Sequence, residues 1–214
     1  MPGSGRPGAR WRWSGALLAL ALAGAACTGD EDATETPTAS TIPPAQTLLR
    51  VGAEDWPECV NPLVCDSPAL RHQVLQHVLP VAFELDAEDE FRPSPLLDGE
   101  PEVEVDGDGM RIRYRLAEEA RWDDGRPVTS SDLRATWQAI MSTPGADRTG
   151  YELIVAIDDR DPLVAEVQLS QPYAEWQQLF GGGRDWILKG DELGPQLDLT
   201  DRFLDELPFS AGPY

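Results

Sequence analysis

The chain has 214 residues, enough to bury a sizeable core in one or two domains. Its formal charge is −21, and three of its 17 basic residues precede residue 27, which leaves 14 basic against 38 acidic residues. A surface of this sign repels nucleic acid and anionic lipid headgroups, so neither is expected as a partner. Two interpretations of the charge stay open: solubility of the surface, or a cleft suited to cationic solutes.

The first 27 residues have the features of an export signal. Three arginines precede an apolar run over 15–26, and small residues then lead to Cys27. Twelve apolar residues are too few to cross a bilayer, which needs about 20. The ending resembles the lipobox of bacterial lipoproteins, although Gly24 stands where that pattern prefers Leu. We predict a lipoprotein signal peptide over 1–26 and lipidation at Cys27, with plain cleavage as the alternative.

Residues 27–47 are rich in Thr, Pro and acidic residues and poor in apolar ones. Such a segment cannot bury enough surface to become ordered. A flexible tether of roughly 20 residues reaches about 25 Å root-mean-square. We therefore predict a disordered acidic tether that holds the following domain away from a membrane that repels it.

A short strand is predicted at 48–52, and the loop after it contains Cys59 and Cys65. In an oxidising compartment these two cysteines are expected to form a disulfide. A metal site is the alternative. It is disfavoured because His72 and His77, five positions apart, lie on different helix faces, and because no second cysteine pair exists. No metal and no cofactor are expected.

Helix and strand patterns then alternate along the chain. The expected elements are a helix at 69–79 ended by Pro80, a strand at 81–86, paired strands at 103–105 and 110–116, a capped helix at 129–141, strands at 154–159 and 163–169, and a helix at 173–180. The acidic tetrapeptide 106–109 is interpreted as a hairpin turn, since the remaining ligands of an EF-hand loop are absent. The glycine run 181–183 is interpreted as a flexible connection, because no Gly-Lys-Ser/Thr follows it.

The strongest local pattern is a strand, a turn and a capped helix. Apolar residues alternate with arginines over 110–116, the period of a half-buried strand. Gly125 follows two aspartates in a turn. Thr129 stands where a helix N-cap should be, with Asp132 three residues later. The apolar stripe of the helix comprises Leu133, Thr136, Trp137, Ile140 and Met141.

This unit carries a resemblance to a known family. The run Arg121-Trp122-Asp123-Asp124-Gly125-Arg126-Pro127-Val128-Thr129-Ser130-Ser131-Asp132, after Tyr114-Arg115-Leu116, resembles the signature F-x-L-R … W-x-D-G-x-P-V-T-A-x-D-V. That signature is typical of solute-binding protein family 5 of ABC importers, the oligopeptide-, dipeptide- and nickel-binding type. The ending Ala211-Gly212-Pro213-Tyr214 is similar to the family's G-T-G-P-Y.

The resemblance implies an α/β fold of the periplasmic-binding-protein type, with two lobes that close on a ligand and an extra subdomain on the first lobe. Residues 48–78 would begin lobe I, residues 79–160 would form the extra subdomain, and residues 161–214 would continue lobe I before lobe II. The signature would then support the fold rather than touch the ligand. We expect the reading frame to continue past Tyr214, and the chain alone to bind solute poorly.

The function that this resemblance implies is extracytoplasmic solute binding. The protein would be lipid-anchored to the outer face of the cytoplasmic membrane, at the cell surface or in the periplasm. It would deliver a peptide or similar small solute to an ABC permease and ATPase complex, and contact the membrane only through its anchor. No enzyme is expected, since the sequence has neither a G-x-S-x-G nor an H-E-x-x-H motif. The alternatives are a sensory binding protein without transport and, less favoured, a secreted hydrolase.

Candidate solute contacts also follow from the resemblance. Asp66 and Ser67 come directly after the second cysteine in the loop that borders the family's ligand cleft. Tyr151 lies where family members offer an aromatic residue, and Trp176 is a further candidate. A core or ordinary surface position is the alternative for each. The sequence does not select the solute, because peptides, nickel complexes and sugars share this fold.

Overall fold

The computed structural model describes residues 57–65, 67–181 and 185–212. The chain divides into two compact units, Met1–Leu49 and Arg50–Tyr214, and all the described residues belong to the second. The predicted signal peptide, lipidation site, tether and first strand lie outside the described residues, as does Asp66.

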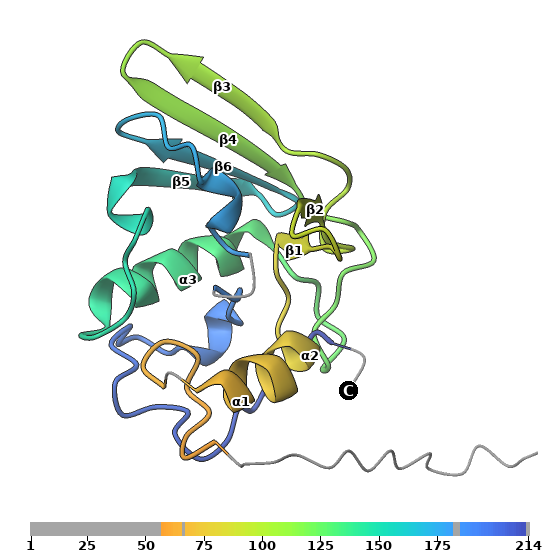
Figure 1. The fold of residues 1–214 in the computed structure, drawn as a ribbon, viewed down its shortest axis with the longest axis vertical. Coiled ribbons are helices and arrows are strands. Elements are labelled where there is room, and N and C mark those ends of the chain that lie inside the picture. Colours follow the sequence, from red (N-terminus) through yellow and green to blue (C-terminus); the bar gives the residue numbers. More distant parts are fainter. Residues whose placement is uncertain (1–56, 66, 182–184, 213–214) are drawn as a thin grey trace, which may run out of the picture. The chain divides into compact units, whose positions relative to one another are not determined.

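The main sheet has four antiparallel strands in the order β3-β4-β6-β5 (Figure 1). Their bounds are Glu102–Asp106 for β3, Gly109–Arg115 for β4, Ile154–Asp161 for β5 and Val164–Leu169 for β6. The pairing of β3 with β4 confirms the predicted hairpin, with Val103 opposite Ile112. The two strands predicted at 154–159 and 163–169 are also confirmed, and β6 pairs with both β4 and β5.

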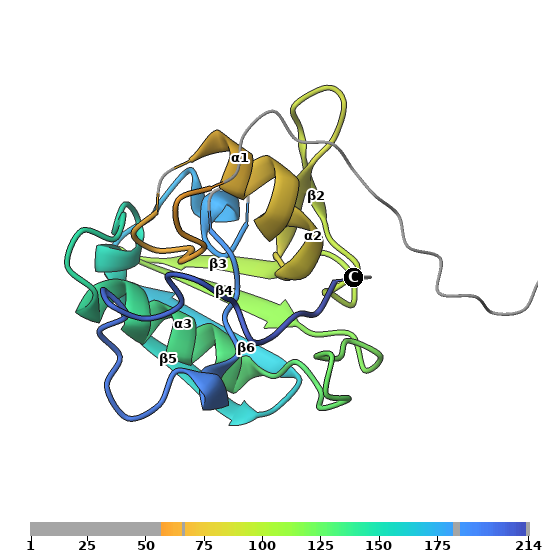
Figure 2. The same ribbon diagram turned by 90° about the horizontal axis from the view of Figure 1, so that it is seen from below.

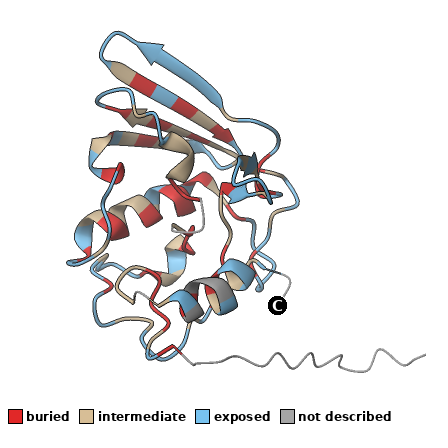
Figure 3. Ribbon diagram, in the orientation of Figure 1, coloured by how far each residue is buried: buried red, intermediate tan, exposed pale blue. Residues whose placement is uncertain are grey.

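Helix α3, Ser130–Ser142, lies along one face of this sheet (Figures 1 and 2). The capping box predicted from Thr129 and Asp132 is present at its start. Leu133, Thr136 and Ile140 are buried, as the helical stripe predicts. Figure 3 shows the matching alternation of buried and exposed positions along β4. The core therefore forms between α3 and the inner face of the sheet.

The first described helical segment is continuous but mixed in type. It consists of α1 at Pro68–Leu70, a π-helical stretch at Arg71–Leu75, and α2 at Gln76–Val78. The predicted helix at 69–79 is thus confirmed in place, and it ends two residues before Pro80. The strand predicted at 81–86 is shorter than expected, because β1 covers only Phe83–Leu85. It pairs antiparallel with β2, Phe91–Pro93.

The prediction of a helix over 173–180 is wrong. Only one 3-10 turn forms, Trp176–Gln178, and two similar turns occur at Tyr151–Leu153 and Gly190–Glu192. Leu179 is extended and Phe180 has a φ of 60°, a left-handed conformation that cannot continue a right-handed helix. Leu179 and Phe180 are nevertheless buried.

The last described segment, 193–212, is irregular and returns to the beginning of the described chain. The backbone N–H of Val60 donates to the carbonyl of Leu204 at 2.9 Å, and that of Ala211 donates to the carbonyl of Val78 at 2.8 Å. None of the helices within 57–65, 67–181 and 185–212 has the length and apolar character that crossing a membrane requires.

Candidate functional site

Asp132 is the centre of the signature segment 121–132. Its buried carboxylate accepts hydrogen bonds from the backbone N–H groups of Thr129 and Gly190, both at 2.8 Å. It also accepts from the indole Nε1 of Trp122 at 3.3 Å. One side chain therefore joins the turn before α3, the start of α3 and a segment 58 residues away. The Thr129 hydroxyl also donates to this carboxylate, at 3.3 Å, so the donors all belong to the chain itself, which fits a structural role for the signature.

Lys189 ties the same turn to the later segment. It is the chain's only lysine, its side chain is 4% exposed, and its Nζ donates to Oδ2 of Asp124 at 2.6 Å. This hydrogen bond, more than any other contact, holds the pKa of Asp124 below its ordinary value. Arg126 also pairs with Asp124, at 2.9 Å, and with Asp191. Sequence reasoning missed this role, although a single lysine beside 16 arginines was a visible signal.

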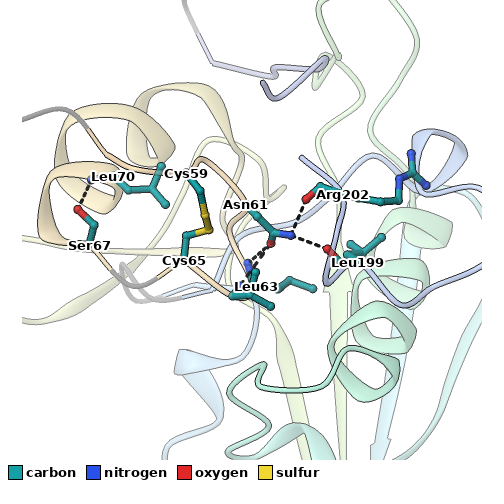
Figure 4. Close-up of a disulfide and its surroundings, with 9 residues drawn as sticks. Cys59, Asn61, Leu63, Cys65, Ser67, Leu70, Leu199 and Arg202 are labelled. Carbon is teal, nitrogen blue, oxygen red and sulfur yellow. Dashed lines mark hydrogen bonds between the residues drawn. A yellow bond between two sulfur atoms is a disulfide. The ribbon is translucent and has the colours of Figure 1, made fainter. Parts of the chain in front are cut away.

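The cystine loop, which we define as residues 59–65, is closed by a disulfide between Cys59 and Cys65 (Figure 4). Their Cα atoms are 6.0 Å apart. Inside the loop, Asn61 is fully buried and makes four hydrogen bonds through its side chain. Sequence reasoning did not identify this anchor. The available signal was that Asn61 is the only asparagine in the chain.

The predicted contact Ser67 lies at the start of α1. It is half-buried, and its Oγ accepts a hydrogen bond from the backbone N–H of Leu70 at 3.4 Å (Figure 4). A serine in this position satisfies a donor that the first helical turn leaves free.

The predicted contact Tyr151 lies in the core. Its side chain is buried, and its hydroxyl accepts a hydrogen bond from the backbone N–H of Phe180 at 2.7 Å. Burial raises the pKa of the Tyr151 hydroxyl well above its ordinary value, so it stays neutral. The residue that it holds, Phe180, has the left-handed backbone that ends the predicted helix.

Trp176 is half-buried and packs edge-on against Phe83, with ring centroids 5.3 Å apart. Tyr151 packs in the same way on Phe180, at 5.3 Å, and the Phe180 carbonyl accepts from the backbone N–H of Ala82. Tyr151 and Trp176 thus belong to two separate aromatic pairs, which the backbone hydrogen bond from Ala82 to Phe180 connects. Ser67 belongs instead to the start of α1.

A surface hollow of about 520 Å³ lies between the end of α2, the β1–β2 hairpin and the turn before α3. Its lining residues are Gln76, Leu79, Pro80, Val81, Glu84, Ser94, Pro95, Leu96, Glu119, Ala120, Arg121, Val128, Ala211 and Gly212. None of Ser67, Tyr151 and Trp176 is among them. The hollow combines an apolar floor with charges of both signs at its rim, and its volume suits a small solute.

Among the described residues, no three or more His, Cys, Asp or Glu side chains are grouped so that they could hold a metal ion.

Comparison with known proteins gives a family match over most of the described chain. Residues 82–214 match the model described as "Bacterial extracellular solute-binding proteins, family 5 Middle".

The curated proteins that are similar in sequence include two from mycobacteria. One is the "Probable monoacyl phosphatidylinositol tetramannoside-binding protein LpqW" of Mycobacterium tuberculosis, 28% identical over 180 residues, which are 78% of this chain and 28% of that protein. The other is the "Oligopeptide-binding protein OppA" of Mycobacterium bovis, 30% identical over 112 residues, which are 48% of this chain and 18% of that protein. The chain thus spans 28% of the length of the first relative and less of the second.

The fold is similar to that of the oligopeptide-binding protein AppA from Bacillus subtilis, whose structure contains a nonapeptide. The TM-score is 0.62 at 17% identity, over 73% of this chain and 31% of the AppA chain. At this identity the likeness shows the fold, which is that of part of a periplasmic-type binding protein.

Proposed function

The chain belongs to the bacterial extracellular solute-binding proteins of family 5, and from this membership we propose that it captures a small solute and delivers it to an ABC permease and ATPase complex. The observation that carries the proposal is the family match over 82–214. That range contains the whole signature segment and both of the segments that Asp132 and Lys189 tie to it.

We also propose the two-lobe architecture, with the described residues in the first lobe and its extra subdomain. The start of the subdomain stays near residue 79. Its end moves from residue 160 to the end of β6 at Leu169, because β6 pairs with both β4 and β5 and a boundary at 160 would cut the sheet. A second lobe facing this one would supply the other wall of the solute site.

The proposed solute is a peptide or a similar small molecule, and the hollow of about 520 Å³ is one part of its wall. The two curated relatives are named for different solutes, a phosphatidylinositol tetramannoside and oligopeptides, so the solute class needs a direct test. Ser67 and Trp176 remain proposed contacts. Tyr151 would act through Phe180 rather than by touching the solute, because its hydroxyl is already engaged there.

The proposed location is outside the cytoplasmic membrane, with the protein held by a lipid on Cys27. The acidic surface then faces a membrane that it does not bind, and the anchor provides the attachment.

Calorimetric titration of the mature full-length protein tests the proposal. The probes are a tetra-alanine peptide, a nickel–histidine complex and a mannosylated phosphatidylinositol, each added separately. Saturable one-to-one binding of one probe, with the probe recovered intact, supports solute binding. Recovery of cleaved probe would instead favour the hydrolase, and loss of solute uptake on deleting a neighbouring permease gene separates transport from sensing.

A further inference from the structure

Asn61 uses its whole hydrogen-bonding capacity in one place. Its Nδ2 donates to the carbonyls of Leu199 at 2.6 Å and of Arg202 at 2.7 Å. Its Oδ1 accepts from the backbone N–H groups of Leu63 at 2.8 Å and of Val64 at 3.3 Å. An amide offers two donors and two acceptor lone pairs, so all four are engaged (Figure 4).

No other side chain supplies this pattern in the same space. Aspartate has the same shape but would turn an acceptor oxygen toward two carbonyls. Alanine would remove the Asn61 partner of the Arg202 carbonyl and of two N–H groups, and the Leu199 carbonyl would keep only the backbone N–H of Arg202. The disulfide closes the loop around Asn61 and limits the positions that the amide can take. A second link, from Val60 N–H to the Leu204 carbonyl, runs beside the amide.

The segment that receives these bonds, 199–204, contains a strained residue. Phe203 has a φ of 55°, which is rare for a bulky side chain. Such a backbone conformation persists when surrounding contacts stabilise it. Asn61 supplies one such contact, because it donates to the carbonyl of Arg202, the residue directly before Phe203.

The other side of this segment is held by α3. Thr143, buried at the C-terminal end of α3, accepts at Oγ1 from the backbone N–H of Leu199 at 3.0 Å and donates to the carbonyl of Leu197 at 3.3 Å. The N-terminal end of the same helix carries Asp132 and the hydrogen bonds that its carboxylate accepts.

We infer that Asn61 is a positioning residue that latches the cystine loop to the 199–204 segment and, through Thr143, to α3. The three segments then order as one unit. For solute binding, the inference rests on the proposed function, in which Ser67, two residues after the cystine loop, contacts the solute. Asn61 acts there through the loop, since its own side chain is fully buried.

Amide hydrogen exchange on the full-length protein tests the latch. In Asn61→Asp, the N–H groups of Leu63 and Val64 keep an oxygen acceptor. The carbonyls of Leu199 and Arg202 lose the amide donor, and the Leu199 carbonyl keeps only the backbone N–H of Arg202. The latch predicts at least tenfold faster exchange of the Leu199 and Arg202 amides, with β4 and β6 unchanged. Thr200→Ala is the matched control, because Thr200 is exposed on the same segment and its side chain bonds only to Asp198. Faster exchange confined to 59–65 would overturn the inference.

The pH dependence separates a hydrogen-bonding role from a steric one. When the carboxyl group introduced by Asn61→Asp is protonated, it regains one O–H donor. The ratio of variant to wild-type exchange at Leu199 and Arg202 should therefore fall toward one as the pH is lowered. A ratio that does not change with pH contradicts the latch.

If Asn61→Asp does not fold, the double variant Cys59→Ser/Cys65→Ser tests the latch instead, since it keeps the Asn61 amide and opens the cystine loop. The same tenfold change at 199 and 202 is expected, and its absence would refute the latch. Thr143→Val tests the reverse direction, because coupling is reciprocal: exchange at Leu63 and Val64 should accelerate. These measurements use no solute. A failed latch therefore leaves the proposed function standing, and a failure to bind any probe leaves the latch standing.

Discussion

Asp132 shows, at the residue scale, how one carboxylate organises distant parts of the chain. An ionised carboxylate only accepts hydrogen bonds, and here its acceptors face donors of a turn, a helix start and a later segment. The capping half of this arrangement is local, so the sequence spacing predicts it. The contact with Gly190 is not local, and no spacing rule reaches across 58 residues.

Replacing Asp132 by Ala should destabilise the protein by about 3 kcal/mol or more, because each buried donor left without a partner costs about 1–3 kcal/mol. Asn, which keeps one acceptor oxygen, should cost less. The measurement is urea unfolding followed by tryptophan fluorescence. Ser131→Ala, at an exposed position of the same turn, is the control and should change the free energy of unfolding by under about 0.5 kcal/mol. Equal effects of the Ala variants at 131 and 132 would contradict this role.

Lys189 gives a prediction about pH. It lowers the pKa of Asp124, so that carboxyl stabilises the folded state above its unfolded pKa of about 3.9, and the contribution is lost as the pH falls through the lower, folded value. Replacing Lys189 by Met removes the largest cause of that lowering. The difference in the free energy of unfolding between wild type and Lys189→Met should therefore shrink as the pH falls from 6 to 3. A difference that stays constant over this range would show that the pair is not coupled to protonation.

Other residue-level roles were hidden for a physical reason. Asn61 and Lys189 act through partners more than 60 positions away in the sequence, so only their rarity in the composition was visible. Tyr151 looked like a cleft aromatic, but its hydroxyl turns inward to a backbone N–H that the sequence does not reveal.

At the element scale, sequence patterns correctly predicted the helix and strands whose formation depends on interactions between residues close together in the chain. The β3–β4 hairpin and the capped helix follow from turn residues, strand alternation and an N-cap. The helix at 173–180 failed because its apolar spacing suits a helix and a buried loop equally. The tertiary hydrogen bond from the Phe180 N–H to the Tyr151 hydroxyl stabilises the loop conformation, in which Phe180 has a positive φ.

The start of α3 gives a prediction at this scale. Thr129→Ala removes the side-chain half of the capping box and should lower the free energy of unfolding by about 1 kcal/mol. Thr129→Ser keeps the hydroxyl and should lower it by no more than half as much. Urea unfolding measures both, and a Ser variant as unstable as the Ala variant would exclude capping as the cause.

The cystine loop gives the second element-scale prediction. A ring this short should stabilise the protein by about 2 kcal/mol in the chain-entropy model. Replacing both cysteines by serine should therefore lower the midpoint of urea unfolding without changing its slope. Peptide mass analysis of the wild type under non-reducing conditions should find 59 and 65 linked, and two free thiols there would contradict the prediction.

For the whole molecule, the signature predicted the family, and the match over 82–214 confirms it. The reason is that the signature segment forms a structural unit with Lys189 and Gly190, and both of these residues lie inside the matched range. The solute was not predictable from the same residues, because the side chains that hold this unit together, Trp122 and Asp132, are buried. Of the described candidates, Ser67, Tyr151 and Trp176 all lie outside the hollow formed by α2, the β1–β2 hairpin and the turn before α3.

The central claim, that this protein binds a solute, is tested most directly by thermal unfolding of the mature full-length protein with increasing concentrations of each probe. A solute that binds only the folded state stabilises it by about 2.7 kcal/mol at 100 times its dissociation constant. We predict that the melting temperature rises with the concentration of one probe class and stays constant with the others. A folded, cooperatively melting protein whose melting temperature no peptide, metal chelate or glycolipid raises would contradict the account.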